Sequence, residues 1–282
     1  MKRFVRSGRA ELCVEDSGTS GPALVCLHAG VADRRMWGPQ VEAFGATHRV
    51  IAYDRRGFGE TRYEAESFSH VGDLIAVLDA LQIDSAVLMG CSQGGRIAID
   101  AALAHPSRVR ALVLVANAVT GAPESTEPDP PHVQAVVEEY ERAEQRGDPA
   151  ELNQIECRVW LDGPEAAAGR VQGPLRELFL SMNGIALAAP PTGDAVQAPS
   201  AWDRVEEIGV PTLVIWGSLD FPHLRRRLIE LARRIPGAQS FVMDCVAHLP
   251  GLELPEEFNR EVAAFLTKAS TSSARTDPHN SP

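Results

Sequence analysis

Short apolar, β-branched runs recur along this 282-residue chain, and apolar residues at helical spacing fill the stretches between them. Seven runs have the length and composition of strands: residues 10–15, 23–27, 49–53, 86–89, 109–115, 212–216 and 239–243. Helices are predicted at residues 36–44, 68–81, 94–104, 224–234 and 256–267. Strands that alternate with helices are typical of a parallel sheet built from right-handed crossovers. The pattern therefore predicts an α/β fold with a mostly parallel sheet flanked by helices.

The alternation stops between residues 120 and 203. A Pro-rich loop at 122–131 leads into helical patterns at 133–146, 150–161 and 175–182, and an Ala/Pro-rich stretch follows at 188–199. We predict an inserted helical cap over residues 120–203, and a core domain formed by residues 1–119 and 204–268. Residues 269–282 are polar and lack periodicity, which predicts a disordered tail.

Composition narrows the choice of partner. The chain carries 27 Lys and Arg against 38 Asp and Glu, a formal net charge of −11, which argues against nucleic acid or an anionic membrane as partner. No apolar run is long enough to span a membrane or to form a signal peptide. The five cysteines are scattered, as expected of reduced thiols in the cytoplasm. We expect a cytoplasmic protein with a small-molecule substrate. No pattern indicates a metal, a cofactor or an oligomeric state.

The strongest chemical signal is the segment Gly90-Cys91-Ser92-Gln93-Gly94, which lies between a predicted strand and a predicted helix. A serine in this context sits on a sharp, strained turn that raises its hydroxyl above the sheet, and small neighbours avoid a clash there. The helix that follows directs backbone N–H groups at the same point. We predict Ser92 as a nucleophile, the N–H of Gln93 as an oxyanion donor, and Cys91 as a buried structural thiol.

A second oxyanion donor is expected from the turn His28-Ala29-Gly30, which follows the strand at 23–27. A turn of small residues permits close approach of the backbone to a substrate, so we assign this donor to the N–H of Gly30. His28 is expected to brace the loop rather than to act as a base.

The remaining members of a catalytic triad are sought in the loops after later strands. Asp220 follows the strand at 212–216, whereas the loop after the strand at 109–115 offers only Asn117, which cannot carry a negative charge. His248 lies between the last strand and the last helix, and the alternative base is His223. The chain order Ser92, Asp220, His248 favours His248 as the base and Asp220 as its partner.

Taken together, these motifs resemble the α/β-hydrolase family over nearly the whole chain except the tail. The segments that carry the resemblance are 28–30, 53–59, 90–94, 217–220 and 247–248. Residues 211–265 are similar to enol-lactonase-like and esterase-like members. Ala29 departs from the Gly that many members have, a change small enough to leave the turn intact. The resemblance implies an eight-stranded sheet with a helical cap over the active site.

The resulting hypothesis is a serine hydrolase that cleaves a small, largely apolar carboxylic ester or lactone through an acyl-enzyme. Candidates for the substrate pocket are Trp37, Trp160, Leu161, Phe179 and Met182, although residues at such spacing are more often simple packing. A carbon–carbon bond hydrolase is the first alternative, with Arg158 or Arg170 of the cap binding a substrate carboxylate. The second is a non-hydrolytic member that only binds a ligand.

Overall fold

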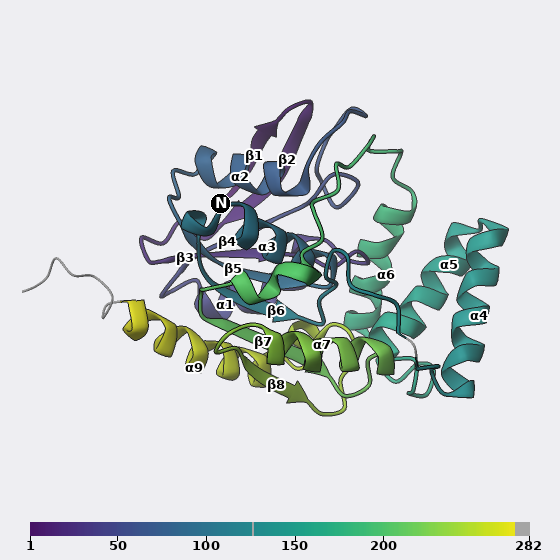
Figure 1. Cartoon of the computed structure of the whole chain (residues 1–282). Coiled ribbons are helices and arrows are strands. Elements are labelled where there is room, and N and C mark those ends of the chain that lie inside the picture. Colours follow the sequence, from purple (N-terminus) through teal and green to yellow (C-terminus); the bar gives the residue numbers. More distant parts are fainter. Residues whose placement is uncertain (126, 274–282) are drawn as a thin grey trace, which may run out of the picture.

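The computed structural model describes residues 1–125 and 127–273, which are built around a central eight-stranded sheet (Figure 1). The strand order is β1-β2-β4-β3-β5-β6-β7-β8. The strands are β1 (Lys2–Ser7), β2 (Ala10–Asp16), β3 (Ala23–Leu27), β4 (Arg49–Tyr53), β5 (Ala86–Cys91), β6 (Val109–Val115), β7 (Thr212–Gly217) and β8 (Gln239–Met243). β2 runs antiparallel to both of its neighbours, β1 and β4, and the other described strand pairs are parallel. The predicted α/β class with a mostly parallel sheet is confirmed.

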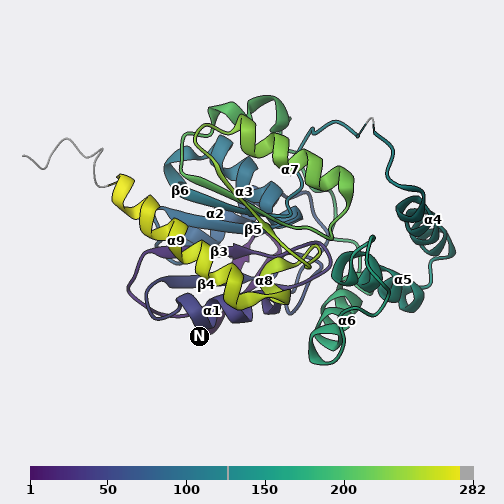
Figure 2. The same cartoon turned by 90° about the horizontal axis from the view of Figure 1, so that it is seen from below.

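Helices cover both faces of the sheet (Figure 2). One face carries α2 (His70–Ala80), α3 (Gln93–Ala104) and α7 (Pro222–Arg234), and the other carries α1 (Gly38–Phe44), α8 (Pro250–Glu253) and α9 (Pro255–Ser273). Four short 3₁₀ or π segments complete the set: η1 (Arg34–Trp37), η2 (Pro106–Arg108), η3 (Cys157–Asp162) and η4 (Trp202–Glu207). β5 and β6 are almost wholly buried because both of their faces are covered.

Strand β1 is absent from the sequence prediction. Three of its residues are basic and exposed, and only Val5 is buried, so the run has no strand-like apolar pattern. It forms a hairpin with β2 through Gly8, whose φ of +55° favours glycine. Charged side chains on an edge strand discourage pairing with other chains.

The predicted cap region contains α4 (Pro131–Arg146), α5 (Pro149–Glu156) and α6 (Pro174–Leu187), which lie together beside one end of the sheet in both views (Figures 1 and 2). The helix expected at 150–161 ends as an α-helix at Glu156 and continues as the π-helix η3. After α6 the chain returns along the loop that follows β4, where the Val196 N–H donates to the Phe68 carbonyl at 2.7 Å. We retain residues 120–203 as the proposed cap.

Helix α9 extends five residues into the predicted disordered tail. Ala269 packs against the core, and the hydroxyl of Thr267 donates back to the carbonyl of Ala263, so the helix continues to Ser273. Residues 274–282 lie outside the described part of the chain. None of the described helices is both long enough and apolar enough to cross a membrane.

Candidate active site

Ser92, Asp220 and His248 all follow the carboxyl ends of strands in one half of the sheet. Ser92 comes directly after β5, Asp220 three residues after β7, and His248 five residues after β8. Ligand sites of open α/β sheets form outside the carboxyl ends of strands, near the point where the strand order reverses. Here that point lies between β3 and β5, beside Ser92.

Ser92 occupies a strained turn, as predicted from its glycine neighbours. Its φ of 52° and ψ of −115° lie in a region that non-glycine residues rarely adopt. The Ser92 N–H donates to the Val115 carbonyl at 2.9 Å, and the Ser92 carbonyl accepts from the Ala118 N–H at 3.1 Å. These bonds to the end of β6 hold the turn against its strain.

Glycine is needed at the turn because the backbone of β3 approaches it closely. A Cβ on Gly94 would lie 2.1 Å from the carbonyl oxygen of Leu27, which belongs to a central strand and cannot move. We expect Gly94→Ala to lower the free energy of unfolding by about 3 kcal/mol, measured by urea denaturation. Gly38→Ala is the matched control: no atom lies within 4 Å of its Cβ position, so a change within about 1 kcal/mol is expected. Equal effects of the two changes would contradict the steric account.

The imidazole of His248 is paired with the carboxylate of Asp220. Nδ1 of His248 lies 2.8 Å from Oδ2 of Asp220, and both side chains are buried. The other carboxylate oxygen accepts from the Phe221 N–H at 2.8 Å. With both oxygens bound, Asp220 has one orientation, which fixes the ring of His248 and leaves Nε2 without a partner among the described residues.

The two loops that carry this pair are bound to each other through the backbone. The Leu219 N–H donates to the Val246 carbonyl at 2.9 Å, and the Cys245 N–H donates to the Ser218 hydroxyl at 3.0 Å. A Cβ on Gly217 would lie 2.2 Å from the carbonyl oxygens of Val246 and Ala247. The loops after β7 and β8 are therefore packed as one unit.

The His248 loop also contacts the serine turn. The thiol of Cys91, next to Ser92, lies 3.5 Å from the His248 carbonyl. Within residues 1–125 and 127–273, no hydrogen bond joins the Ser92 hydroxyl to Nε2 of His248. Catalytic hydrogen bonds of this kind are often long in the free enzyme and tighten in the substrate complex.

The proposed oxyanion donors lie together beside the serine. The N–H groups of Gly30 and Gln93 have no hydrogen-bond partner in the described part of the chain, and both residues are only half-buried. The side-chain amide of Gln93 lies against Gly30, with Nε2 2.8 Å from where a Cβ would be. Two N–H groups without partners in the described residues, on segments that the Gln93 side chain brings into contact, suit an oxygen that gains negative charge.

His28 braces the turn and is not a base. Its Nε2 accepts from the Arg55 N–H at 3.0 Å, and Nδ1 lies 2.7 Å from the Ala29 carbonyl, which assigns the ring proton to Nδ1. Burial, and then the charge of Arg55, hold the pKa of His28 well below its usual value. A ring that is neutral and bonded at both nitrogens holds the loops after β3 and β4 together.

The rival residues from the sequence are engaged elsewhere. Nδ1 of His223 lies 2.7 Å from the carboxylate of Asp129, in a pair separate from that of His248. Asn117 donates its side-chain amide to the Ala118 carbonyl at 3.1 Å. Burial raises the pKa of the Cys91 thiol well above its usual value, which keeps it protonated.

Of the five pocket candidates, Trp160 makes a ring contact with the triad. Its ring centroid lies 4.5 Å from that of His248 and 5.2 Å from that of Phe221, and the ring is half-buried. The other four belong to the fully buried core cluster on the α9 face: Trp37, Leu161, Phe179 and Met182. The π-helix η3 places Trp160 against the histidine loop, where its carbonyl accepts from the His248 N–H at 3.3 Å.

The cap arginines considered for binding a substrate carboxylate are already bound. Arg158 donates to Glu139 at 2.6 Å. Arg170 donates to the carbonyls of Leu161, Asp162 and Cys245 at 2.6–3.0 Å and pairs with Glu253. All three nitrogens of the Arg170 guanidinium are engaged, whereas Nε and Nη2 of Arg158 have no partner in the described residues, so of the two only Arg158 retains free donors for a carboxylate.

Two residues of the site region were missed by sequence reasoning. Glu253 is almost fully buried, pairs with Arg170 and accepts from the Ala247 N–H at 2.9 Å, which supports the residue next to His248. Arg55 lies in the segment 53–59 that carries the family resemblance, where the sequence favours a charged loop that fixes a turn over a loop that contacts substrate; the structure buries its guanidinium beside Gly30.

A third histidine near the site, His70, makes stability depend on pH. Burial, with a contribution from Arg55, lowers its pKa from 6.5 to about 3. Because the unfolded chain takes up this proton first, stability is complete above pH 6.5 and falls as the pH drops toward 3. The slope for this group is at most about 1.4 kcal/mol per pH unit. In urea unfolding at pH 7, 6 and 5, His70→Asn should flatten the decline, whereas His132→Asn, at an exposed position, should not. An unchanged slope in His70→Asn would remove this explanation.

In the part of the chain that the structure describes, no group of three or more His, Cys, Asp or Glu residues could hold a metal ion. The site as built consists of one serine, one histidine–carboxylate pair and two unpartnered N–H groups. Such a set can attack a carbonyl carbon, move a proton and hold an oxyanion.

The family model, the sequence relatives and the similar solved structures agree with one another. A family model described as the alpha/beta hydrolase fold matches residues 22–255. A 2-hydroxy-6-oxononadienedioate/2-hydroxy-6-oxononatrienedioate hydrolase of Burkholderia vietnamiensis is 31% identical over 264 residues, 90% of each chain. The solved enol-lactonase of Burkholderia xenovorans is 26% identical, with a TM-score of 0.73 over 95% of this chain and 100% of that one. An esterase of Thermogutta terrifontis has the same identity and TM-score, over 95% and 98% of the two chains.

Proposed function

The chain belongs to the alpha/beta hydrolase fold family, and on that premise we propose that it is a serine hydrolase that cleaves a small, largely apolar carboxylic ester or lactone through an acyl-enzyme. The observation that carries the proposal is the buried His248–Asp220 pair, with Nδ1 and Oδ2 2.8 Å apart, on the loop that contacts the serine turn. The enol-lactonase and esterase among the similar structures point to the same substrate class.

The proposed reaction has two halves. Ser92 Oγ attacks the carbonyl carbon while Nε2 of His248 takes its proton, and Asp220 stabilises the imidazolium. The N–H groups of Gly30 and Gln93 hold the oxyanion. As the acyl-enzyme forms, the departing alkoxide takes the proton from His248. Water then attacks the acyl carbon, giving its proton to His248, and the acid leaves as Ser92 recovers its proton.

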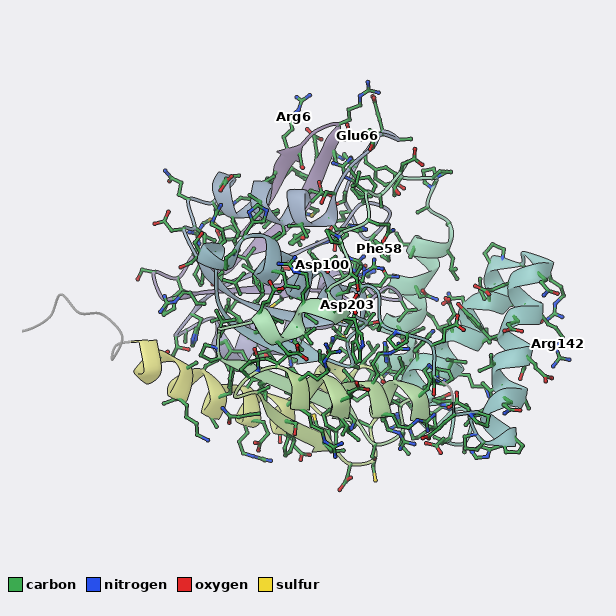
Figure 3. The ribbon with its side chains drawn as sticks, viewed as in Figure 1. Arg6, Phe58, Glu66, Asp100, Arg142 and Asp203 are labelled. Atoms are coloured by element: carbon green, nitrogen blue, oxygen red, sulfur yellow. The ribbon has the colours of Figure 1, made fainter. Side chains whose placement is uncertain are left out.

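An apolar substrate is supported by the aromatic surroundings of the base. Trp160 contacts the imidazole directly, and Phe221 contacts Trp160. Phe58, labelled in Figure 3, packs against His28 with ring centroids 4.7 Å apart. Arg142, also labelled there, extends from the outer side of α4, away from the core. Aromatic rings beside the base favour acyl groups without charge.

Carbon–carbon bond hydrolysis is the second candidate, because the relative from Burkholderia vietnamiensis carries that kind of name. Such a substrate with a terminal carboxylate needs a cationic partner; all nitrogens of Arg170 are engaged, and the charge of Arg158 is already paired with Glu139. Rates on a neutral ester, a lactone and a vinylogous β-diketone acid, compared at equal concentration, distinguish the two. We expect the ester or lactone to be preferred; a preference for the diketone acid would reverse the assignment.

The direct test uses the wild-type protein. We expect turnover of p-nitrophenyl butyrate and stoichiometric labelling by a fluorophosphonate, which reacts only with an activated serine. A protein that is neither labelled nor active would refute the proposal, and the remaining alternative, a ligand-binding member without hydrolysis, would take its place.

A further inference from the structure

Two consecutive arginines follow β4, and both are buried: Arg55 is 1% exposed and Arg56 3%. Arg56 is compensated by acidic groups, since it donates to both oxygens of Asp73 at 2.9 and 3.0 Å and to Glu66 at 2.5 Å. Arg55 forms no ion pair with any described residue, and the polar groups that accept its hydrogen bonds there are all uncharged. Burying a charge without an opposite charge beside it costs free energy, so the difference between the two arginines needs a physical reason.

The acceptors of Arg55 are the groups that shape the proposed oxyanion site. Its Nη2 donates to the carbonyls of Ala29 at 3.0 Å and His28 at 3.3 Å, the two residues before Gly30. Its Nη1 donates to Oε1 of Gln93 at 2.9 Å. The guanidinium carbon also lies 4.5 Å from the ring centroid of Phe58. One rigid cation therefore contacts both elements that carry the proposed N–H donors.

This contact determines which way the Gln93 amide is turned. A guanidinium has donors only, so it requires the oxygen of the amide, and the NH₂ group must face the opposite side. Nε2 is accordingly the Gln93 atom nearest the Cβ position of Gly30, at 2.8 Å. Within the described residues the hydrogen bond of this side chain is the one that its oxygen accepts from Arg55, so the NH₂ group has no acceptor there, and Gln93 is half-buried.

We propose that the Gln93 side-chain amide is a third oxyanion donor, and that Arg55 is the positioning residue that orients this amide and the Gly30 turn. The inference rests on the proposed hydrolase function. The neutral amide supplies N–H groups beside those of the Gly30 and Gln93 backbone. The uncompensated charge of Arg55 adds a positive field in a region of low dielectric, where it acts on the developing oxyanion with little screening.

The test compares Gln93→Leu, Arg55→Met, the double variant and Arg55→Lys in the full chain, with p-nitrophenyl butyrate as substrate. Removing a donor that acts only on the transition state lowers kcat with little effect on KM. We expect Gln93→Leu to lower kcat by about 10²-fold and KM to stay within about 3-fold. Arg55→Met should lose slightly more, because the charge is also removed. The double variant should match Arg55→Met, since both changes act through one amide.

Two further measurements exclude a merely structural effect. The inhibition constant of butaneboronic acid, whose adduct with Ser92 imitates the tetrahedral intermediate, should rise by the same factor as kcat falls. Arg55→Lys should lower kcat by about 10-fold, because one ammonium keeps the charge but cannot bind the three acceptors as a fork. Arg56→Lys is the matched control at the adjacent, compensated arginine, and its kcat should stay within about 3-fold.

The possible results distinguish failure of this inference from failure of the proposed function on which it rests. A wild-type protein without hydrolytic activity would remove the proposed function and this inference with it. An active wild type whose Gln93→Leu and Arg55→Lys variants keep full kcat would overturn the inference alone. Additive losses in the double variant would also overturn it. If Arg55→Met fails to fold, Gln93→Leu and Arg55→Lys decide the question.

Discussion

Replacement of Ser92 by alanine is expected to lower kcat for p-nitrophenyl butyrate by about 10⁴–10⁶-fold and to abolish fluorophosphonate labelling. The reason is that no other described nucleophile occupies the turn between β5 and α3. The change should leave folding intact or slightly improved, because alanine at φ 52° loses only a hydroxyl that makes no hydrogen bond within the described residues. Activity is measured by initial rates, and folding by thermal denaturation.

The neighbouring thiol provides the control. Cys91 is fully buried with a raised pKa, so Cys91→Ala should keep kcat within about tenfold and retain labelling. If Ser92→Ala remains active while Cys91→Ala does not, the nucleophile has been assigned to the wrong residue.

Asp220→Asn is expected to lower kcat by about 10⁴-fold with a small change in KM. The asparagine keeps the shape of the side chain but no longer compensates an imidazolium, and its NH₂ group can favour the wrong ring tautomer of His248. Because both oxygens of Asp220 accept hydrogen bonds, the substitution also leaves one donor facing another. The pH dependence of kcat should therefore change as well as its size.

The chain contains a matched control for this change. Asp129 pairs with His223 at 2.7 Å, in the same chemical arrangement but away from the serine turn. Asp129→Asn should leave kcat unaltered. A similar loss in both variants would indicate a general effect of acid-to-amide changes on stability, and a loss only in Asp129→Asn would transfer the base role to His223.

The local pattern of apolar residues predicted most of the fold, because the strands of a parallel sheet covered on both faces are continuous apolar runs in the sequence. It failed at β1, where a single buried residue, Val5, carries no periodicity. It also failed at the end of α5: nothing in residues 150–161 distinguishes the wider π-turn of η3, which carries Trp160 and its contact with His248.

The candidate site likewise has features that the sequence predicts and features that it does not. The glycines around Ser92 indicate a tight turn, because the steric requirement that they meet is local in the sequence. The order of the triad residues along the chain could also be predicted. The ion pair of Arg170 could not be predicted, since its partner Glu253 is 83 residues away. The distinction between Arg55 and Arg56 was likewise hidden. Two adjacent arginines look alike in sequence and differ only in which of them meets the carboxylates of Asp73 and Glu66.

The attachments of Arg170 have a mechanical consequence. Its guanidinium joins the carbonyls of Leu161 and Asp162 to that of Cys245, and the Trp160 carbonyl binds the backbone of His248. These hydrogen bonds hold residues 157–170 and the histidine loop together, so a displacement of one is expected to displace the other. Because the loops that carry His248 and Asp220 are also bound to each other, displacing this stretch is expected to disturb both members of the pair together.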